Sequence, residues 1–193
     1  MAEPTANPQN PHTLVLLANL GRPRRPAGMT EPHAEPILPD PTVASAQLAQ
    51  LIDQPVAAAD LADLRRLQRA AVHAAEAILA GEALDGAELN ALAAASTARV
   101  ELAVTEGTPR RRLVWTDPSL AAALARRLVE ELGALDTDRL RGCARPECDL
   151  LFYDTTRSRT RRWHAEAPCG WRERQRLHRT PQASRSRSPG NRG

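Results

Sequence analysis

The residues of this chain that are best suited to chemistry are its three cysteines and one histidine near the C-terminus. Cys143, Cys148, His164 and Cys169 follow the pattern Cys-x4-Cys, fifteen intervening residues, and then His-x4-Cys. Two close pairs of ligands, separated by a gap long enough to fold back, are typical of a tetrahedral zinc site. Because four protein ligands leave no open position on the metal, the spacing predicts a structural Zn²⁺ site, and we expect no enzyme activity.

Two alternatives to a metal site are chance clustering and a disulfide. All three cysteines of the chain lie within 27 residues, which argues against chance. The N-terminus is acidic and rich in proline, whereas a secretion signal is basic and then apolar. Apolar stretches such as Leu14 to Ala18 are too short to cross a membrane. We therefore expect a cytoplasmic protein without a membrane partner, whose thiols stay reduced and bind metal.

The elements that must position the four ligands are indicated by the same segment. The turn from Cys143 to Cys148 is followed by a β-prone run, Leu150 to Tyr153, and Thr160 to Trp163 can return as a second strand. Residues Trp171 to Arg179 contain no glycine or proline, which favours a short helix beginning just after Cys169. A knuckle, a hairpin and a helix in this order predict a treble-clef-like zinc module.

This segment, residues 141–179, resembles the CGNR zinc-finger family. The residues that carry the resemblance beyond the first cysteine pair are Phe152, Asp154, Thr155, Arg157, Arg161, Arg162, Trp163, Cys169, Gly170 and Arg172. Two positions depart from the family pattern: His164 stands where the family usually has cysteine, and Trp171 stands where it has asparagine. Histidine can also ligate zinc, so the site is retained. The resemblance implies a role in transcription regulation, with an ABATE-type domain preceding the zinc module.

Charge is distributed unevenly along the chain. Residues 1–140 hold 13 arginines and 18 acidic residues, whereas residues 141–193 hold 13 arginines and 5 acidic residues, a net charge of +8. A dense arginine surface on a small zinc module favours nucleic acid as the partner. A solvated basic face and a docking site for an acidic protein are the alternatives. The candidate DNA contacts are Arg157, Arg159, Arg161, Arg162, Arg172, Arg176 and Arg179.

The larger N-terminal part, residues 13–136, is predicted to be a mostly helical domain, similar to an ABATE domain. Apolar residues recur at helical spacing, and two β-prone runs flank Gly107. We expect helices over residues 43–52, 61–80, 85–95 and 120–132, paired strands over 100–104 and 112–115, and either a strand or a helical turn over 13–20. Six prolines in residues 21–41 exclude regular structure there. Residues 1–12 and the basic tail, 180–193, are predicted to be disordered.

These observations predict a mostly α protein with small β elements and a zinc finger that binds double-stranded DNA. Its expected role is that of a transcription regulator whose N-terminal domain forms a homodimer or senses a signal. The alternative is a zinc-stabilised protein-interaction module that docks an acidic partner. The sequence contains no phosphate-binding loop, dinucleotide fingerprint or zinc-protease motif.

Overall fold

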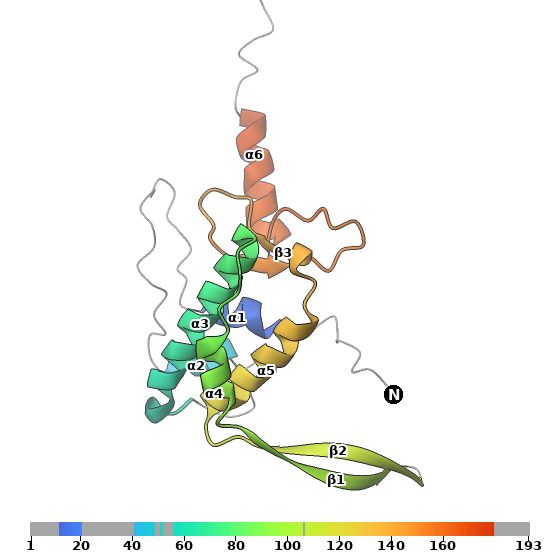
Figure 1. Cartoon of the computed structure of the whole chain (residues 1–193). Coiled ribbons are helices and arrows are strands. Elements are labelled where there is room, and N and C mark those ends of the chain that lie inside the picture. Colours follow the sequence, from blue (N-terminus) through green and yellow to red (C-terminus); the bar gives the residue numbers. More distant parts are fainter. Residues whose placement is uncertain (1–11, 21–40, 49–50, 52–55, 106, 180–193) are drawn as a thin grey trace, which may run out of the picture.

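The computed structural model describes residues 12–20, 41–48, 51, 56–105 and 107–179. In this part the chain combines α-helices with two small antiparallel sheets, as the sequence predicts (Figure 1). The helices are α1 (Thr13–Asn19), α2 (Pro41–Leu48), α3 (Leu61–Ala80), α4 (Ala87–Ala93), α5 (Leu120–Ala134) and α6 (Trp171–Arg179). The strands are β1 (Thr97–Thr105), β2 (Thr108–Thr116), β3 (Leu140–Gly142) and β4 (Leu151–Tyr153). The two predicted disordered ends and the proline-rich segment 21–41 lie outside the described residues, apart from His12 and Pro41, and Pro41 is the first residue of α2.

The helical core is formed mainly by α1, α3, α4 and α5. Leucines at three- and four-residue spacing turn one face of each helix inward, and Leu14, Leu64 and Leu128 are fully buried. Helix α3 ends at Gly81, whose φ of 69° is the left-handed conformation that glycine adopts without strain. The predicted helices are therefore confirmed, and α4 is shorter than expected. Residues 49, 50 and 52 of the expected 43–52 helix lie outside the described residues.

The first apolar run, which the sequence leaves open between strand and helix, forms helix α1. The carboxylate of Glu131 in α5 accepts hydrogen bonds from the backbone N–H groups of Thr13 (2.7 Å) and Leu14 (3.1 Å). These N–H groups have no partner within a helix, so Glu131 satisfies them and also complements the positive end of α1. At the other end of α1, the buried Gln68 donates a hydrogen bond to the carbonyl of Leu20.

Strands β1 and β2 form a long hairpin that extends away from the helices, at the opposite end of the molecule from α6 (Figure 1). Both strands are longer than the sequence predicts, and Val100 pairs with Leu113. Gly107 lies in the turn with a φ of 75°. Because side chains alternate between the two faces, one face of this ribbon is largely apolar and exposed, and the other carries arginine and glutamate.

The second sheet connects the helices to the cysteine-rich segment. Strand β3 pairs antiparallel with β4, and Leu140 and Leu151 are buried in the same core as α1 and α3. The prediction of a return strand over residues 160–163 is wrong, because β4 pairs with residues 140–142 instead. No helix in the described ranges is long and apolar enough to cross a membrane.

Candidate metal centre and its arginine-rich surroundings

The first two cysteines lie in a turn that joins β3 to β4. The N–H of Cys143 donates to the carbonyl of Leu150 (2.9 Å), which extends the ladder of the small sheet by one bond. The N–H of Cys148 donates to the carbonyl of Arg145 (2.9 Å) and closes the turn. The knuckle, Cys143 to Cys148, therefore connects two strands of a sheet that packs against the helical core. The sheet fixes the positions of both thiols.

His164 is positioned by an arginine of its own loop. The guanidinium of Arg161 donates to the carbonyl of Trp163 (2.8 Å) and to the carbonyl of His164, and it stacks over the ring of Phe152 with 4.9 Å to the ring centroid. One side chain therefore ties the backbone at His164 to strand β4. A half-buried guanidinium with two carbonyl acceptors is a structural brace for the ligand loop.

Cys169 lies in a tight turn, Glu166–Gly170, that leads directly into α6, as the sequence predicts. The next residue, Gly170, is buried beside Glu166 and Trp163. A Cβ added there would lie 2.6 Å from Oε2 of Glu166 and 3.1 Å from the ring of Trp163, so both side chains would have to shift. The small residue lets the start of α6 pack closely against Trp163.

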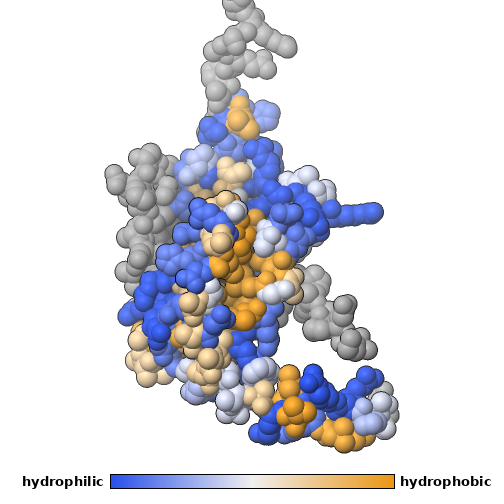
Figure 2. Space-filling model, viewed as in Figure 1, coloured by the Kyte–Doolittle hydropathy of each residue, from blue (hydrophilic) through white to orange (hydrophobic). Residues whose placement is uncertain are grey.

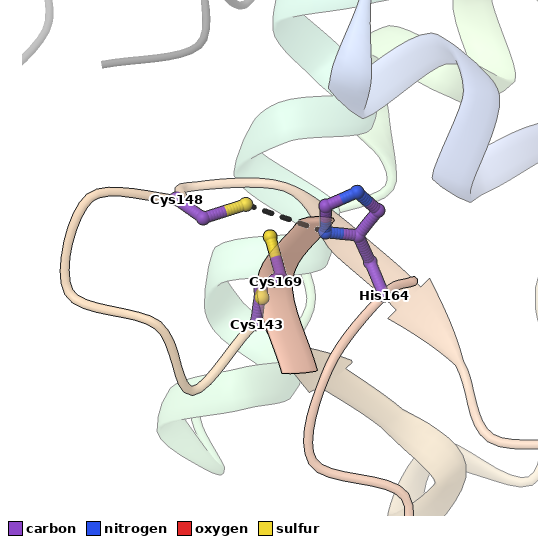
Figure 3. A group of neighbouring side chains, drawn as sticks. All are labelled: Cys143, Cys148, His164 and Cys169. Atoms are coloured by element: carbon purple, nitrogen blue, oxygen red, sulfur yellow. Dashed lines mark hydrogen bonds between the residues drawn. The ribbon is translucent and has the colours of Figure 1, made fainter. Parts of the chain in front are cut away.

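The four predicted ligands converge on one point (Figure 3). Their ligand atoms all lie within 4.8 Å of one another, and Sγ of Cys148 is 3.3 Å from Nδ1 of His164. A tetrahedron with Zn–S and Zn–N bonds of about 2.3 and 2.1 Å has edges of roughly 3.5–3.8 Å. The donor set, three sulfurs and one imidazole nitrogen, is also the set that zinc prefers. The arrangement fits zinc, and Nδ1 is the nitrogen of His164 that faces the site.

The chemical state of the cysteines agrees with metal binding. All three are free thiols, so the disulfide alternative is excluded in this structure. Burial, together with the neighbouring Cys143 and Cys169, raises the pKa of Cys148 to about 12 in the absence of metal. Zinc must therefore displace protons when it binds. Arg145 lies within hydrogen-bonding reach of Cys169, where its positive charge offsets the negative charge of a three-thiolate site.

The loop between β4 and His164 is organised around one buried carboxylate, that of Asp154. It accepts hydrogen bonds from the N–H (2.9 Å) and hydroxyl (2.6 Å) of Thr156 and from the N–H of Arg161 (3.0 Å). Arg141 lies 3.9 Å away. Burial alone would raise the pKa of Asp154, but these hydrogen bonds and the Arg141 charge outweigh it and lower the pKa. With its backbone N–H held by Asp154, the loop does not continue as a strand, which explains the missing return strand.

The predicted DNA contacts fall into three groups in the structure. Arg159 and Arg176 form ion pairs, with Asp136 (2.9 Å) and Glu173 (2.5 Å) respectively, and Arg161 is the internal brace described above. Arg157, Arg162 and Arg172 are exposed and form no ion pair with the described part of the chain. The side chain of Arg179 lies outside the described residues.

Two residues that sequence reasoning missed contribute to the site. Arg145 lies between the knuckle and Cys169, and its only sequence signal is its place inside the Cys-x4-Cys turn. Asn19 of α1 forms two hydrogen bonds with the backbone of Leu151, and no sequence signal connects residues so far apart. Arg145 acts on the ligand Cys169 directly, whereas Asn19 acts on the position of strand β4.

Comparison with known protein families identifies part of this chain. No curated protein is significantly similar to the chain. The model of the CGNR zinc finger family matches residues 139–182, a range that contains all four ligands, β4 and α6. The C-terminal part of this chain therefore holds a zinc-finger-type module of the CGNR kind, and Cys143, Cys148, His164 and Cys169 form a cluster that fits zinc.

Proposed function

We propose that the chain is a DNA-binding protein whose zinc module contacts double-stranded DNA and that it acts as a transcription regulator. The observation that carries the proposal is the set of exposed arginines on this module that lack ion pairs within the described residues: Arg157, Arg162 and Arg172. Unpaired guanidinium groups are available to phosphates, whereas neutralised ones must first lose a partner. The upper part of the molecule, around α6, is mostly hydrophilic (Figure 2).

Zinc supplies rigidity in this proposal, not catalysis. The metal joins the knuckle, the His164 loop and the start of α6, so the arginines on these three segments keep a fixed spacing. Residues 143–179 bury little apolar surface of their own, and metal binding supplies much of their folding free energy. A treble-clef-like arrangement of knuckle and helix, with four protein ligands and no open metal position, suits this structural role.

The test is the salt dependence of binding to duplex DNA. Three phosphate contacts give a slope of log affinity against log salt of about −2.7, taking roughly 0.9 per contact. Replacing Arg157, Arg162 and Arg172 with alanine should bring the slope close to zero. Arg69→Ala, an exposed arginine of α3, is the matched control and should leave the slope unchanged. If the zinc-loaded protein binds an acidic peptide but no duplex at low salt, the protein-docking alternative replaces this proposal.

The helical part, residues 13–136, is proposed to be an ABATE-like domain that forms the homodimer or senses a signal. The surface that supports a dimer is the apolar face of the hairpin, where Val100, Leu102 and Val104 are 65%, 76% and 68% exposed (Figure 2). A two-stranded ribbon with one uncovered apolar face is marginally stable in water. Covering that face stabilises the hairpin.

A second copy of this chain is the occupant that fits the apolar hairpin face best. The tip of the hairpin carries Arg110 and Arg111, whereas Asp117 follows β2 at its base. There Arg126 of α5 pairs with both Asp117 and Glu130 of the same helix, which leaves one net negative charge. If two hairpins pack face to face about a two-fold axis with strands antiparallel, the basic tip of each lies beside the acidic base of the other. The charges along the ribbon are thus complementary to a second copy.

A further inference from the structure

The knuckle and α6 enclose a groove of about 530 Å³ beside the metal centre. Arg145 and Glu147 of the knuckle form one side. On the other side lie the α6 residues Trp171, Arg172 and Arg176, with Glu173 between them. Because both sides begin at zinc ligands, the metal sets the width of the groove. The groove is the part of the zinc module where a large aromatic side chain and several arginines face the same space.

Trp171 is the unusual member of this group. It is the first residue of α6, and 55% of it is exposed, although it is the largest apolar side chain lining the groove. The other tryptophan of the module, Trp163, is more buried and lies beneath the guanidinium groups of Arg162 and Arg174. An indole left open to solvent beside arginines presents a planar surface with no partner of its own in the described part of the chain.

The charges of the groove favour an anion at one place. Arg145 pairs with Glu147 (2.8 Å), and Arg176 pairs with Glu173, whose pKa is lowered mainly by that hydrogen bond. Arg172 is left without an acidic partner among the described residues, so the groove carries one net positive charge next to the indole. Both carboxylates are already neutralised by arginine, so the groove is unsuited to a second metal ion.

We propose that this groove binds an unpaired nucleotide of a nucleic-acid strand, with its base stacked on Trp171 and its phosphate on Arg172. The proposal rests on the nucleic-acid binding proposed above and narrows its target to sites that contain a single-stranded or extruded base. Stacking on an aromatic side chain tolerates any base, because every base has a flat π-face. An acidic peptide would use the arginines but would leave the indole uncovered, which makes it the weaker candidate.

The experiment compares strand and duplex binding by the full-length, zinc-loaded protein. The probes are an oligo(dT) strand of about 12 nucleotides and an unbroken duplex of the same length. Trp171→Ala should weaken binding to the strand by about 5- to 100-fold, the effect expected for losing one stacked base. Trp171→Phe should lose less, because it keeps an aromatic ring. Both variants should keep their zinc and bind the duplex within about 2-fold of wild type.

Tryptophan fluorescence gives a second readout of the same contact. Oligo(dT) should quench part of the wild-type emission, and this quenching should disappear in Trp171→Phe but persist in Trp115→Phe, which changes the hairpin instead. The proposal is overturned if Trp171→Ala binds the strand as wild type does, or loses strand and duplex equally. It is also overturned if AMP displaces bound oligo(dT) from wild type as effectively as unlabelled oligo(dT) does. The same holds if polyglutamate displaces oligo(dT) equally well from wild type and from Trp171→Ala.

Failure of this proposal can be told apart from failure of the proposed function. If wild type binds the duplex with the expected salt slope while Trp171→Ala has no effect on strand binding, only the groove proposal fails. If wild type binds neither strand nor duplex at low salt, both proposals fail together.

Discussion

The side-chain amide of Asn19 forms two hydrogen bonds with the backbone of Leu151, a residue 132 positions later in the chain. Its Nδ2 donates to the Leu151 carbonyl (2.9 Å), and its Oδ1 accepts from the Leu151 N–H (2.9 Å). The amide thus takes the place of a neighbouring strand at the free edge of β4. Since β4 lies between Cys148 and the buried Asp154, helix α1 helps to set the position of the metal centre.

We predict that Asn19→Ala destabilises the protein by about 1–3 kcal/mol, because it leaves a part-buried N–H and carbonyl of Leu151 without partners. The free energy of unfolding in urea measures this effect. Asn90→Ala, at an exposed asparagine of α4, should change it little. Equal stability of the Asn19 and Asn90 variants would show that the contact between α1 and β4 is not important for the fold.

The zinc-binding prediction concerns stoichiometry and ligand type. The purified protein should bind one zinc ion per chain, and replacing any one of the three cysteines with serine should release the metal or weaken it strongly. His164→Cys should keep zinc, because sulfur is an equally suitable ligand at that position. Elemental analysis of the reduced protein measures both results. If wild type holds no stoichiometric zinc, the predicted site does not exist. If His164→Cys loses zinc but His164→Ala keeps it, His164 is not a zinc ligand.

The ligand set could be predicted from the sequence because its signal is local: two short spacings and two scarce residue types. The helices were predictable for the same reason, since apolar periodicity and caps such as Gly81 act within a few residues. The pairing partner of β4 could not be predicted from the sequence. The segment Thr160–Trp163 has suitable composition for a strand, but the side chain of Asp154 captures the N–H groups of Thr156 and Arg161 and holds the segment as a loop.

The role of each individual arginine could not be predicted from the sequence either. Arg161 and Arg172 both match the family pattern, yet Arg161 is half-buried against carbonyl groups and Arg172 is exposed without an ion pair among the described residues. Which arginine finds an internal acceptor depends on the tertiary position of backbone carbonyls. Residue spacing does not encode that position.

The stability of the protein should depend on pH through Glu131. Burial alone would raise the pKa of this carboxyl, but hydrogen bonds from His12 and from the N–H groups of Leu14 and Thr13 outweigh burial and lower it. A folded-state pKa below the unfolded value means that the stabilisation is present above the unfolded pKa and is lost as pH falls through the folded pKa.

Glu131→Gln should therefore lower the free energy of unfolding by about 1–3 kcal/mol at neutral pH, where hydrogen bonds to the charged carboxylate are lost. The difference from wild type should shrink as the pH falls below about 4. Denaturation in urea at several pH values measures it. Glu130→Gln, at the neighbouring, more exposed position of α5, is the control. A difference that stays constant with pH would mean that Glu131 does not act through its charge.

The dimer proposed above predicts a difference between the two faces of the hairpin. Val100→Asp places a charge on the apolar face, directly across from Leu113, and should convert the protein to a monomer, because a buried, unpaired carboxylate is costly. Ala103→Asp places the same charge on the opposite face, across from Arg110, and should leave the dimer intact. Sedimentation velocity measures the state of both. A monomeric wild type at tens of micromolar, or equal behaviour of the two variants, contradicts the interface.

Substitutions at Arg161 and Arg172 should have different effects, because Arg161 supports the metal centre and Arg172 is proposed to contact DNA. Arg161→Ala removes two hydrogen bonds to the carbonyls at Trp163 and His164, so it should reduce zinc retention in a chelator competition and weaken DNA binding as a consequence. Arg172→Ala should keep wild-type zinc retention. It should reduce the slope of log affinity against log salt for duplex binding by about one unit, the loss of one phosphate contact.

Arg161→Lys is the control for charge, because lysine keeps the positive charge but has no planar fork with which to reach both carbonyls. If Arg161→Lys holds zinc and binds DNA as wild type does, charge alone explains Arg161 and the brace is unnecessary. If Arg172→Ala loses zinc, its effect on DNA reports folding of the module and not a phosphate contact.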